Sequence, residues 1–131
     1  MLQLVYVSTA PMGADIDIDG ILAVSRRNNS RDQITGLLYS DGRRFLQALE
    51  GPKDRVEAAF ARIKADPRHR AVVTLSTRTI EAREFGAWEM AHRLPGADAD
   101  QFIARVADLC AGAAPDVRAT FKGFAEVRRA A

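Results

Sequence analysis

The strongest constraint on the fold is an Asp-Gly pair at positions 41 and 42, which stands between two short apolar segments. Asp-Gly favours the tight turn that joins two antiparallel strands. The flanking segments, residues 34–39 and 43–49, carry the β-branched and aromatic residues that are typical of strands. A β-hairpin is therefore predicted in the first half of the chain.

An amphipathic helix is predicted on each side of this hairpin. Before it, three aspartates precede apolar residues at helical spacing, so a helix is expected to end near Asn28. After it, Gly51 and Pro52 end the second strand, and Pro52 suits the first position of a helix over residues 52–65. A helix therefore flanks the hairpin on either side.

Three further strands complete the sheet, at residues 2–8, 71–79 and 87–92. The resulting order, β-α-β-β-α-β-β, predicts an α+β, ferredoxin-like fold in which both crossover helices cover one face of the sheet. Tyr6 shares the apolar face of the first strand with Leu2 and Leu4.

Pro95-Gly96 is predicted to end this domain, which gives a first domain over residues 1–95 and a helical extension over residues 96–131. Residues 97–111 place Phe102 and Val106 on one side of a helix, and a second amphipathic helix follows Pro115. Because the crossover helices leave one face of the sheet open, the helical extension is expected to cover it.

Composition and charge exclude several classes of protein. Of the 131 residues, 47% are hydrophobic and 27% charged, and no apolar run approaches the roughly 20 residues needed to span a bilayer. We expect a cytoplasmic protein without a membrane partner, since the N-terminus lacks a signal-peptide pattern. A single cysteine and two separated histidines argue against a disulfide or a zinc site. With a net charge of +2 and dispersed arginines, no nucleic-acid partner is expected.

Polar side chains are predicted on the helix-covered face of the sheet. Gln47 alternates with apolar residues that face the helices, and burying an unpartnered amide costs roughly 1–3 kcal/mol. Tyr6, in the neighbouring strand, points to the same layer, and Asn28 and Asn29 are predicted to close the first helix nearby. A phenol and several amides suit the edge of a planar heterocycle with alternating donors and acceptors.

Five stretches carry a family resemblance: LVYVS, NNSRDQITG, RRFLQALEGP, DPRHR and FGAWEM. In order and spacing, over about residues 1–95, they resemble the BLUF domains, flavin-based sensors of blue light. The most specific combination is FLQALEG with Tyr6 and the pair Trp88-x-Met90. The resemblance implies a photosensor rather than an enzyme, with FAD bound non-covalently between the two crossover helices. The sequence leaves the preference between FAD and FMN open.

The resemblance also implies roles for the polar residues. Tyr6 matches the photochemical donor of an electron and a proton, and Gln47 matches the glutamine that links this phenol to flavin N5 and C4=O. Asn29 matches the asparagine that bonds the C4=O and N3–H edge of the flavin. Asn28 matches a more variable position that also contacts the ring.

Further cofactor contacts follow from the same resemblance. Arg68 and His69 match positions near flavin C2=O and the ribityl chain, and Asp66 matches a ribityl contact. Ile21 and Ile63 match the aliphatic residues that sandwich the ring. Each of these positions alone has an ordinary structural interpretation, such as an apolar helix stripe or a satisfied histidine.

Signal output is expected to pass through Trp88 and Met90, which match a pair near the glutamine in the family. Which of them faces the flavin in the dark is left open. The chain has no room for a cyclase or phosphodiesterase, so the resemblance is to short, single-domain members. A homodimer and a downstream protein partner are expected on the same grounds.

Three other functions fit the same fold. A small acyl-phosphate hydrolase needs an arginine and a phosphate cradle in the first strand–helix loop, and residues 8–17 contain neither. If the chain were a binding module without flavin, the purified protein would be colourless. A flavin oxidoreductase needs an open substrate side at N5, where Tyr6 and Gln47 are expected to lie.

Overall fold

The computed structural model describes residues 1–10, 18–40, 43–67, 69–92 and 99–129. Within them, one five-stranded sheet has the order β4-β1-β3-β2-β5. Its strands are β1 (Leu2–Thr9), β2 (Thr35–Ser40), β3 (Arg44–Gly51), β4 (Arg70–Thr79) and β5 (Trp88–His92). The helices are α1 (Ile18–Asp32), α2 (Lys53–Ala65), α3 (Ala99–Leu109) and α4 (Pro115–Arg129).

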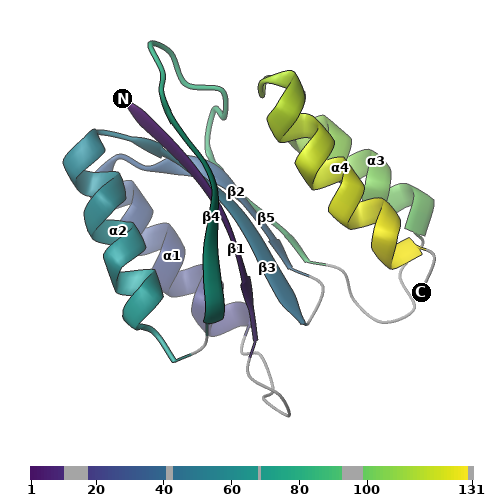
Figure 1. Cartoon of the computed structure of the whole chain (residues 1–131), viewed down its shortest axis with the longest axis horizontal. Coiled ribbons are helices and arrows are strands. Elements are labelled where there is room, and N and C mark those ends of the chain that lie inside the picture. The colour runs from purple at the N-terminus through teal and green to yellow at the C-terminus, as the bar shows by residue number, and fades with distance from the viewer. Residues whose placement is uncertain (11–17, 41–42, 68, 93–98, 130–131) are drawn as a thin grey trace.

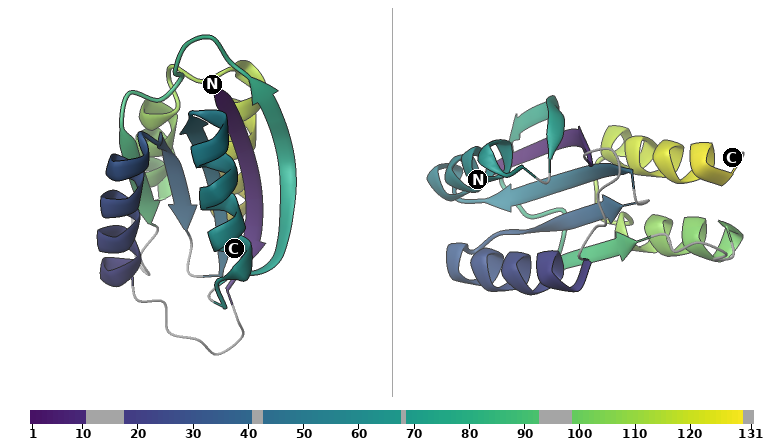
Figure 2. Two further views of the ribbon diagram at one scale, coloured as in Figure 1. Left: turned by 90° about the vertical axis from the view of Figure 1, so that its left-hand side faces the viewer. Right: turned by 90° about the horizontal axis from the view of Figure 1, so that it is seen from below.

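The sheet is covered on both faces, with α1 and α2 on one side and α3 and α4 on the other (Figures 1 and 2). All adjacent strands are antiparallel except β2 and β5, which run parallel. The predicted α+β, ferredoxin-like fold is confirmed, and so is the predicted position of the C-terminal helical pair.

Strand β1 lies between β4 and β3 in the sheet, and its alternate side chains point into two different cores. Leu4 and Tyr6 pack with Val56 and Phe60 of α2, whereas Val5 belongs to the core under α3 and α4. Burial on both faces explains why apolar residues occur on both faces of β1. This arrangement fixes Tyr6 on the side of α1 and α2.

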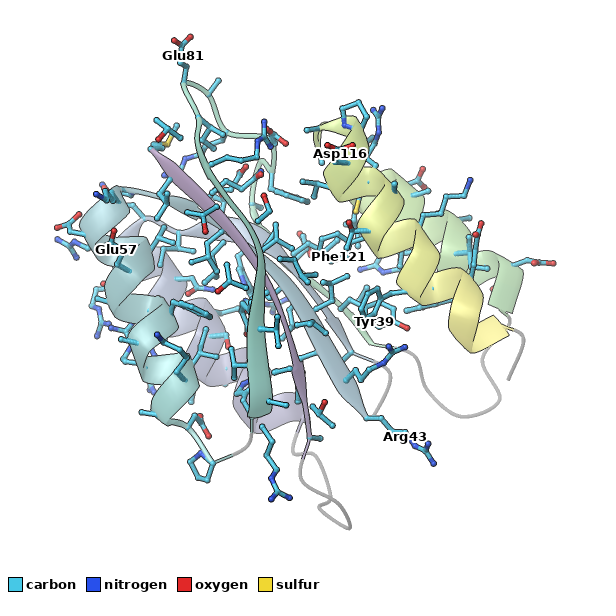
Figure 3. All side chains as sticks on the ribbon, viewed as in Figure 1. Tyr39, Arg43, Glu57, Glu81, Asp116 and Phe121 are labelled. Atoms are coloured by element: carbon cyan, nitrogen blue, oxygen red, sulfur yellow. The ribbon has the colours of Figure 1, made fainter. Side chains whose placement is uncertain are left out.

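The second core is built around Tyr39 and Phe121, which lie between the sheet and α4 (Figure 3). Phe102 of α3 packs on the Tyr39 ring with centroids 5.8 Å apart. The Tyr39 hydroxyl donates to the Phe124 carbonyl oxygen at 3.3 Å. The C-terminal helices are therefore part of the folded core.

The end of α1 differs from the prediction, because the helix continues through Asn28 and Asn29 to Asp32. Gln33 follows at a positive φ of 60°, and its N–H donates to the Ser30 carbonyl oxygen. The Ile34 N–H donates to the Asn29 carbonyl oxygen at 2.8 Å, which completes a Schellman turn. The prediction that the two asparagines cap the helix was wrong, since Gln33 takes the left-handed conformation.

The remaining boundaries moved by a few residues. Strand β3 runs on to Gly51, and Pro52 is the N-cap of α2 instead of its first residue. The antiparallel pairing of β2 with β3 agrees with the predicted hairpin, although its turn, Asp41-Gly42, lies outside the described residues. Pro95-Gly96 also lies outside them.

Candidate functional site

A pocket of about 210 Å³ lies between α1, α2 and the sheet. It brings together seven of the predicted site residues: Tyr6, Asn28, Asn29, Gln47, Ile63, Asp66 and His69. A larger hollow of about 430 Å³, between β4 and α4, contains none of them. The pocket between the helices is therefore the candidate site, because the predicted site residues line it. A choice by volume alone would have favoured a different hollow.

Tyr6 and Gln47 form the centre of this site. They are directly opposite each other on β1 and β3, and the Tyr6 hydroxyl donates to Gln47 Oε1 at 2.6 Å. Tyr6 is 0% exposed and Gln47 4%. Among the described residues no protein group accepts from the Gln47 amino group, so its N–H donors remain for a ligand.

The environment of Tyr6 keeps its phenol protonated. Burial raises the pKa of Tyr6 far above the ordinary value, and the nearby Asp66 carboxylate raises it further. The Phe60 ring packs on the Tyr6 ring with centroids 5.3 Å apart. Tyr6 is therefore held in one position as a neutral hydrogen-bond donor.

His69 closes the pocket beyond the end of α2. Its Nδ1 lies 2.7 Å from the Ser8 hydroxyl, and its ring packs on Phe45 with centroids 4.7 Å apart. The backbone N–H of His69 donates to the Asp66 carbonyl oxygen. Ser8 was missed in the sequence, although it shares the strand face of Tyr6. Arg68 lies outside the described residues.

The helix walls combine amides with apolar groups. Asn28 and Asn29 line the pocket from α1, and Asn29 is 6% exposed. Ile63 and Ala59 line it from α2. The side chain of Ile21 lies outside the described part of the chain, so its predicted place against a ring stays a prediction.

Trp88 lies on β5, beside Gly36 of β2 in the sheet, and packs against Leu38 and Phe45. It does not line the pocket that holds Gln47. Its indole Nε1 is buried without a hydrogen-bond partner in the described structure. Met90 is aligned with Leu38 in the sheet, but its side chain is among those not described.

An ion-pair cluster joins α1 to α2 beside the pocket. The Asp32 carboxylate, only 7% exposed, accepts from Arg31 Nε at 2.9 Å, from Arg62 Nη2 at 3.0 Å and from Arg55 Nη1 at 3.2 Å. Hydrogen bonds from Arg31 lower the pKa of Asp32 below its usual range, and Arg62 lowers it further, although burial opposes this. We call Asp32 and these three arginines the Asp32 cluster.

We predict that Asp32→Asn lowers the free energy of unfolding by about 1 kcal/mol at pH 7, since its partners are half exposed. The folded-state pKa of Asp32 is depressed, so its contribution is present above the unfolded pKa and is lost as the pH falls through the folded pKa. Urea unfolding of both proteins should show a difference that narrows below about pH 4. A difference that does not change with pH would contradict this assignment.

Comparison with known proteins identifies relatives over the same region. A family described as "BLUF: Sensors of blue-light using FAD" matches residues 1–91. The photoactivated adenylate cyclase subunit beta of Euglena gracilis is 38% identical over 87 residues, which are 65% of this chain and 10% of the relative. The blue light- and temperature-regulated antirepressor BluF of Escherichia coli is 36% identical over 69 residues, 53% of this chain and 17% of the relative. The chain thus spans a small part of these relatives.

Solved structures give the same result. The dark-state structure of the BLUF protein BlrB has a TM-score of 0.70 at 30% identity and covers 96% of both chains. Klebsiella pneumoniae BlrP1 with FMN and cyclic diGMP has a TM-score of 0.68 at 32% identity, over 79% of this chain and 29% of that one. In the described part of this chain, no helix is long and apolar enough to cross a membrane.

Proposed function

The chain belongs to the BLUF family of blue-light sensors, and on that premise we propose that it is a photoreceptor that binds FAD non-covalently between α1 and α2. The 2.6 Å hydrogen bond from Tyr6 to Gln47, with the Gln47 amino group left for a ligand, is the observation that carries the proposal. BLUF domains are photosensors and not enzymes.

The residues present fit an isoalloxazine ring. Gln47, Asn28 and Asn29 offer donors and acceptors that suit the carbonyl and N–H edge of the ring, and Ile63 gives an apolar wall. We infer that His69 and Asp66, with Arg68, hold the C2=O and ribityl side, and that Ile21 covers the ring opposite Ile63.

Photochemistry is proposed to begin at Tyr6. A bound flavin would supply a strong oxidant when it is excited by blue light. Tyr6 would give one electron to this oxidant and then its phenolic proton, which would pass through the Gln47 amide. After both have returned to Tyr6, Gln47 would hold a rotated or tautomeric form that donates more strongly to the flavin C4=O, and the absorption would shift slightly to the red.

We propose that the change leaves the site through β2 and β5. Leu38 of β2 lies opposite Gln47 and is aligned on its other side with Met90 of β5. Ala91, the next residue, belongs to the core under α3 and α4. Residues 1–95 would then act as the photosensor, and residues 96–131 would pass the signal to a partner protein within a homodimer.

An absorption spectrum before and after blue light tests the proposed function. We expect a flavin spectrum that shifts slightly to the red and recovers in the dark. A bound flavin without a reversible shift would favour redox chemistry. A protein that takes up no flavin after incubation with FAD would contradict the proposal altogether.

Trp88 provides a test of the signalling route, because it is the one tryptophan of the chain. Labelled with 5-fluorotryptophan, the protein should give a single ¹⁹F resonance that moves on illumination and returns in the dark. The resonance should stay in place in a Gln47→Leu variant. A resonance that is unaffected by light in the wild type would exclude Trp88 from the route.

A further inference from the structure

The exposed apolar side chains of the described structure gather at the β4 edge of the sheet. Val73 is 52% exposed, Leu75 47% and Met1 40%, and no other large apolar side chain of the described residues is as open to solvent. Met1 is bonded through its backbone to Ile80, just beyond the end of β4. Apolar side chains that gather at one place on a surface indicate an interaction site.

Strand β4 lacks the features by which edge strands usually avoid pairing with another chain. With ten residues it is the longest strand of the sheet, and it stands at the end of the strand order. Residues 71–77 contain neither a charged residue nor a proline, whereas protected edges are short or carry such residues. No described strand pairs with its outer side (Figure 2). Its outer backbone N–H and C=O groups can therefore pair with an added strand.

The side of β4 that faces α4 offers apolar contacts to such a strand. Val73 is aligned with Val7 of β1, and the register of the two strands shifts at Leu75. Leu75 and Ser76 consequently both line the hollow of about 430 Å³ between β4 and α4, together with the buried Val5. An added strand would point every second side chain to this same side. The surface therefore suits an extended strand that itself carries apolar side chains.

The charges at the two ends of β4 are complementary to each other. Arg70 is its first residue, and Glu81 lies beyond its other end (Figure 3). Both are exposed, and no described ion pair uses either of them. Arg70 is five residues before Leu75, and Glu81 is five residues after Ser76. A two-fold axis between Leu75 and Ser76 therefore brings Arg70 of one copy opposite Glu81 of the other, at both ends of the contact.

We propose that the outer edge of β4 is the surface on which a second copy of this chain binds, by antiparallel pairing of the two β4 strands around Leu75. This inference rests on the homodimer of the proposed function and assigns its interface. The centre of the contact is apolar and its rim is charged, as in other protein interfaces. In the joined sheet, α3 and α4 of both copies lie on the same face.

Sedimentation velocity of the FAD-loaded protein tests this interface. Two ten-residue strands supply most of the contact, which is less than the roughly 20–30 residues a side of a standard interface, so we expect a weak dimer. The mass should rise from one chain toward two over roughly 1–100 μM. Leu75→Lys should weaken the dimer about tenfold or more, because it places two like charges at the centre. Ala104→Lys adds the same charge at an exposed position on α3 and should leave the dimer unchanged.

A charge exchange tests the antiparallel arrangement. Arg70→Glu and Glu81→Arg should each weaken the dimer about fivefold at low salt, since each places two like charges opposite each other. The variant that carries both substitutions should dimerise as the wild type does. If the combined variant is no stronger than the single variants, the antiparallel pairing is wrong.

Two further results would overturn the interface. One is a single chain at every concentration, and the other is a Leu75→Lys dimer as strong as the wild type, which would place the contact on another surface. The blue-light red shift of the same samples separates these failures from a failure of the proposed function. Tyr6 and Gln47 pair within one chain, so the shift should persist in every variant. A wild type without the shift would remove the photoreceptor function, while the measured mass would still decide the interface.

Discussion

A Gln47→Leu variant is expected to bind flavin and to show no red shift after blue light. Leucine fills a similar volume but cannot accept the hydrogen bond that Tyr6 donates to Gln47 at 2.6 Å. It also cannot donate to a flavin carbonyl, so no second hydrogen-bonding state exists. Flavin binding should persist, because Asn29, Ile63 and His69 line the pocket independently.

The buried Tyr6 hydroxyl loses its acceptor in this variant, which should lower stability by about 1–3 kcal/mol. Gln3→Leu is a matched control for that loss. Gln3 is also a buried glutamine, but it donates to Glu50 at 2.9 Å on the opposite face of the sheet. It should lose stability and keep the red shift. A normal shift in Gln47→Leu would exclude the glutamine switch.

The pairing of Tyr6 with Gln47 was predictable because it needs only two regularities. Period two along each strand sets the face of each side chain, and the ferredoxin-like order makes β1 and β3 neighbours. The sequence gives no such rule for the end of α1. A left-handed Gln33 is unusual, and it was the asparagines before it that suggested a cap.

Polar contacts between distant parts of the chain were not predictable. Glu50 is 0% exposed and accepts from the backbone N–H groups of Glu84 and Phe85 at 3.0 and 2.8 Å. Glu84 in turn accepts from the Ala114 N–H at 2.6 Å. These partners are 30 to 35 residues apart in the chain, so no local pattern marks them.

The positive charge around Asp32 was also not predictable, because it comes from arginines that are far apart in the chain. In the sequence they are dispersed over residues 31–62, and no basic cluster was predicted. The fold brings Arg55 and Arg62 onto the end of α1, around an acid whose position at a helix C-terminus is unfavourable by itself. That position is visible only in the structure, because the helix was predicted to end near Asn28.

A Tyr6→Phe variant is expected to bind flavin and to lose most or all of the red shift. Phenylalanine keeps the ring contact with Phe60, 5.3 Å between centroids in the wild type, but it has no phenolic proton to transfer. It is also much harder to oxidise than a phenol. The Gln47 carbonyl oxygen also loses its donor, so the hydrogen bond that holds the amide in its dark orientation is absent.

Tyr39→Phe is the matched control, since Tyr39 is the other tyrosine of the chain and is also 0% exposed. Its hydroxyl bonds to the Phe124 carbonyl oxygen in the core under α4, so the variant should shift normally. A normal shift in Tyr6→Phe would refute the electron-donor role. Because burial raises the pKa of Tyr6, the wild-type shift should also persist at about pH 10, where exposed tyrosines ionise. A red shift that titrates away with an ordinary tyrosine pKa would mean that Tyr6 is not buried as a neutral donor beside the flavin.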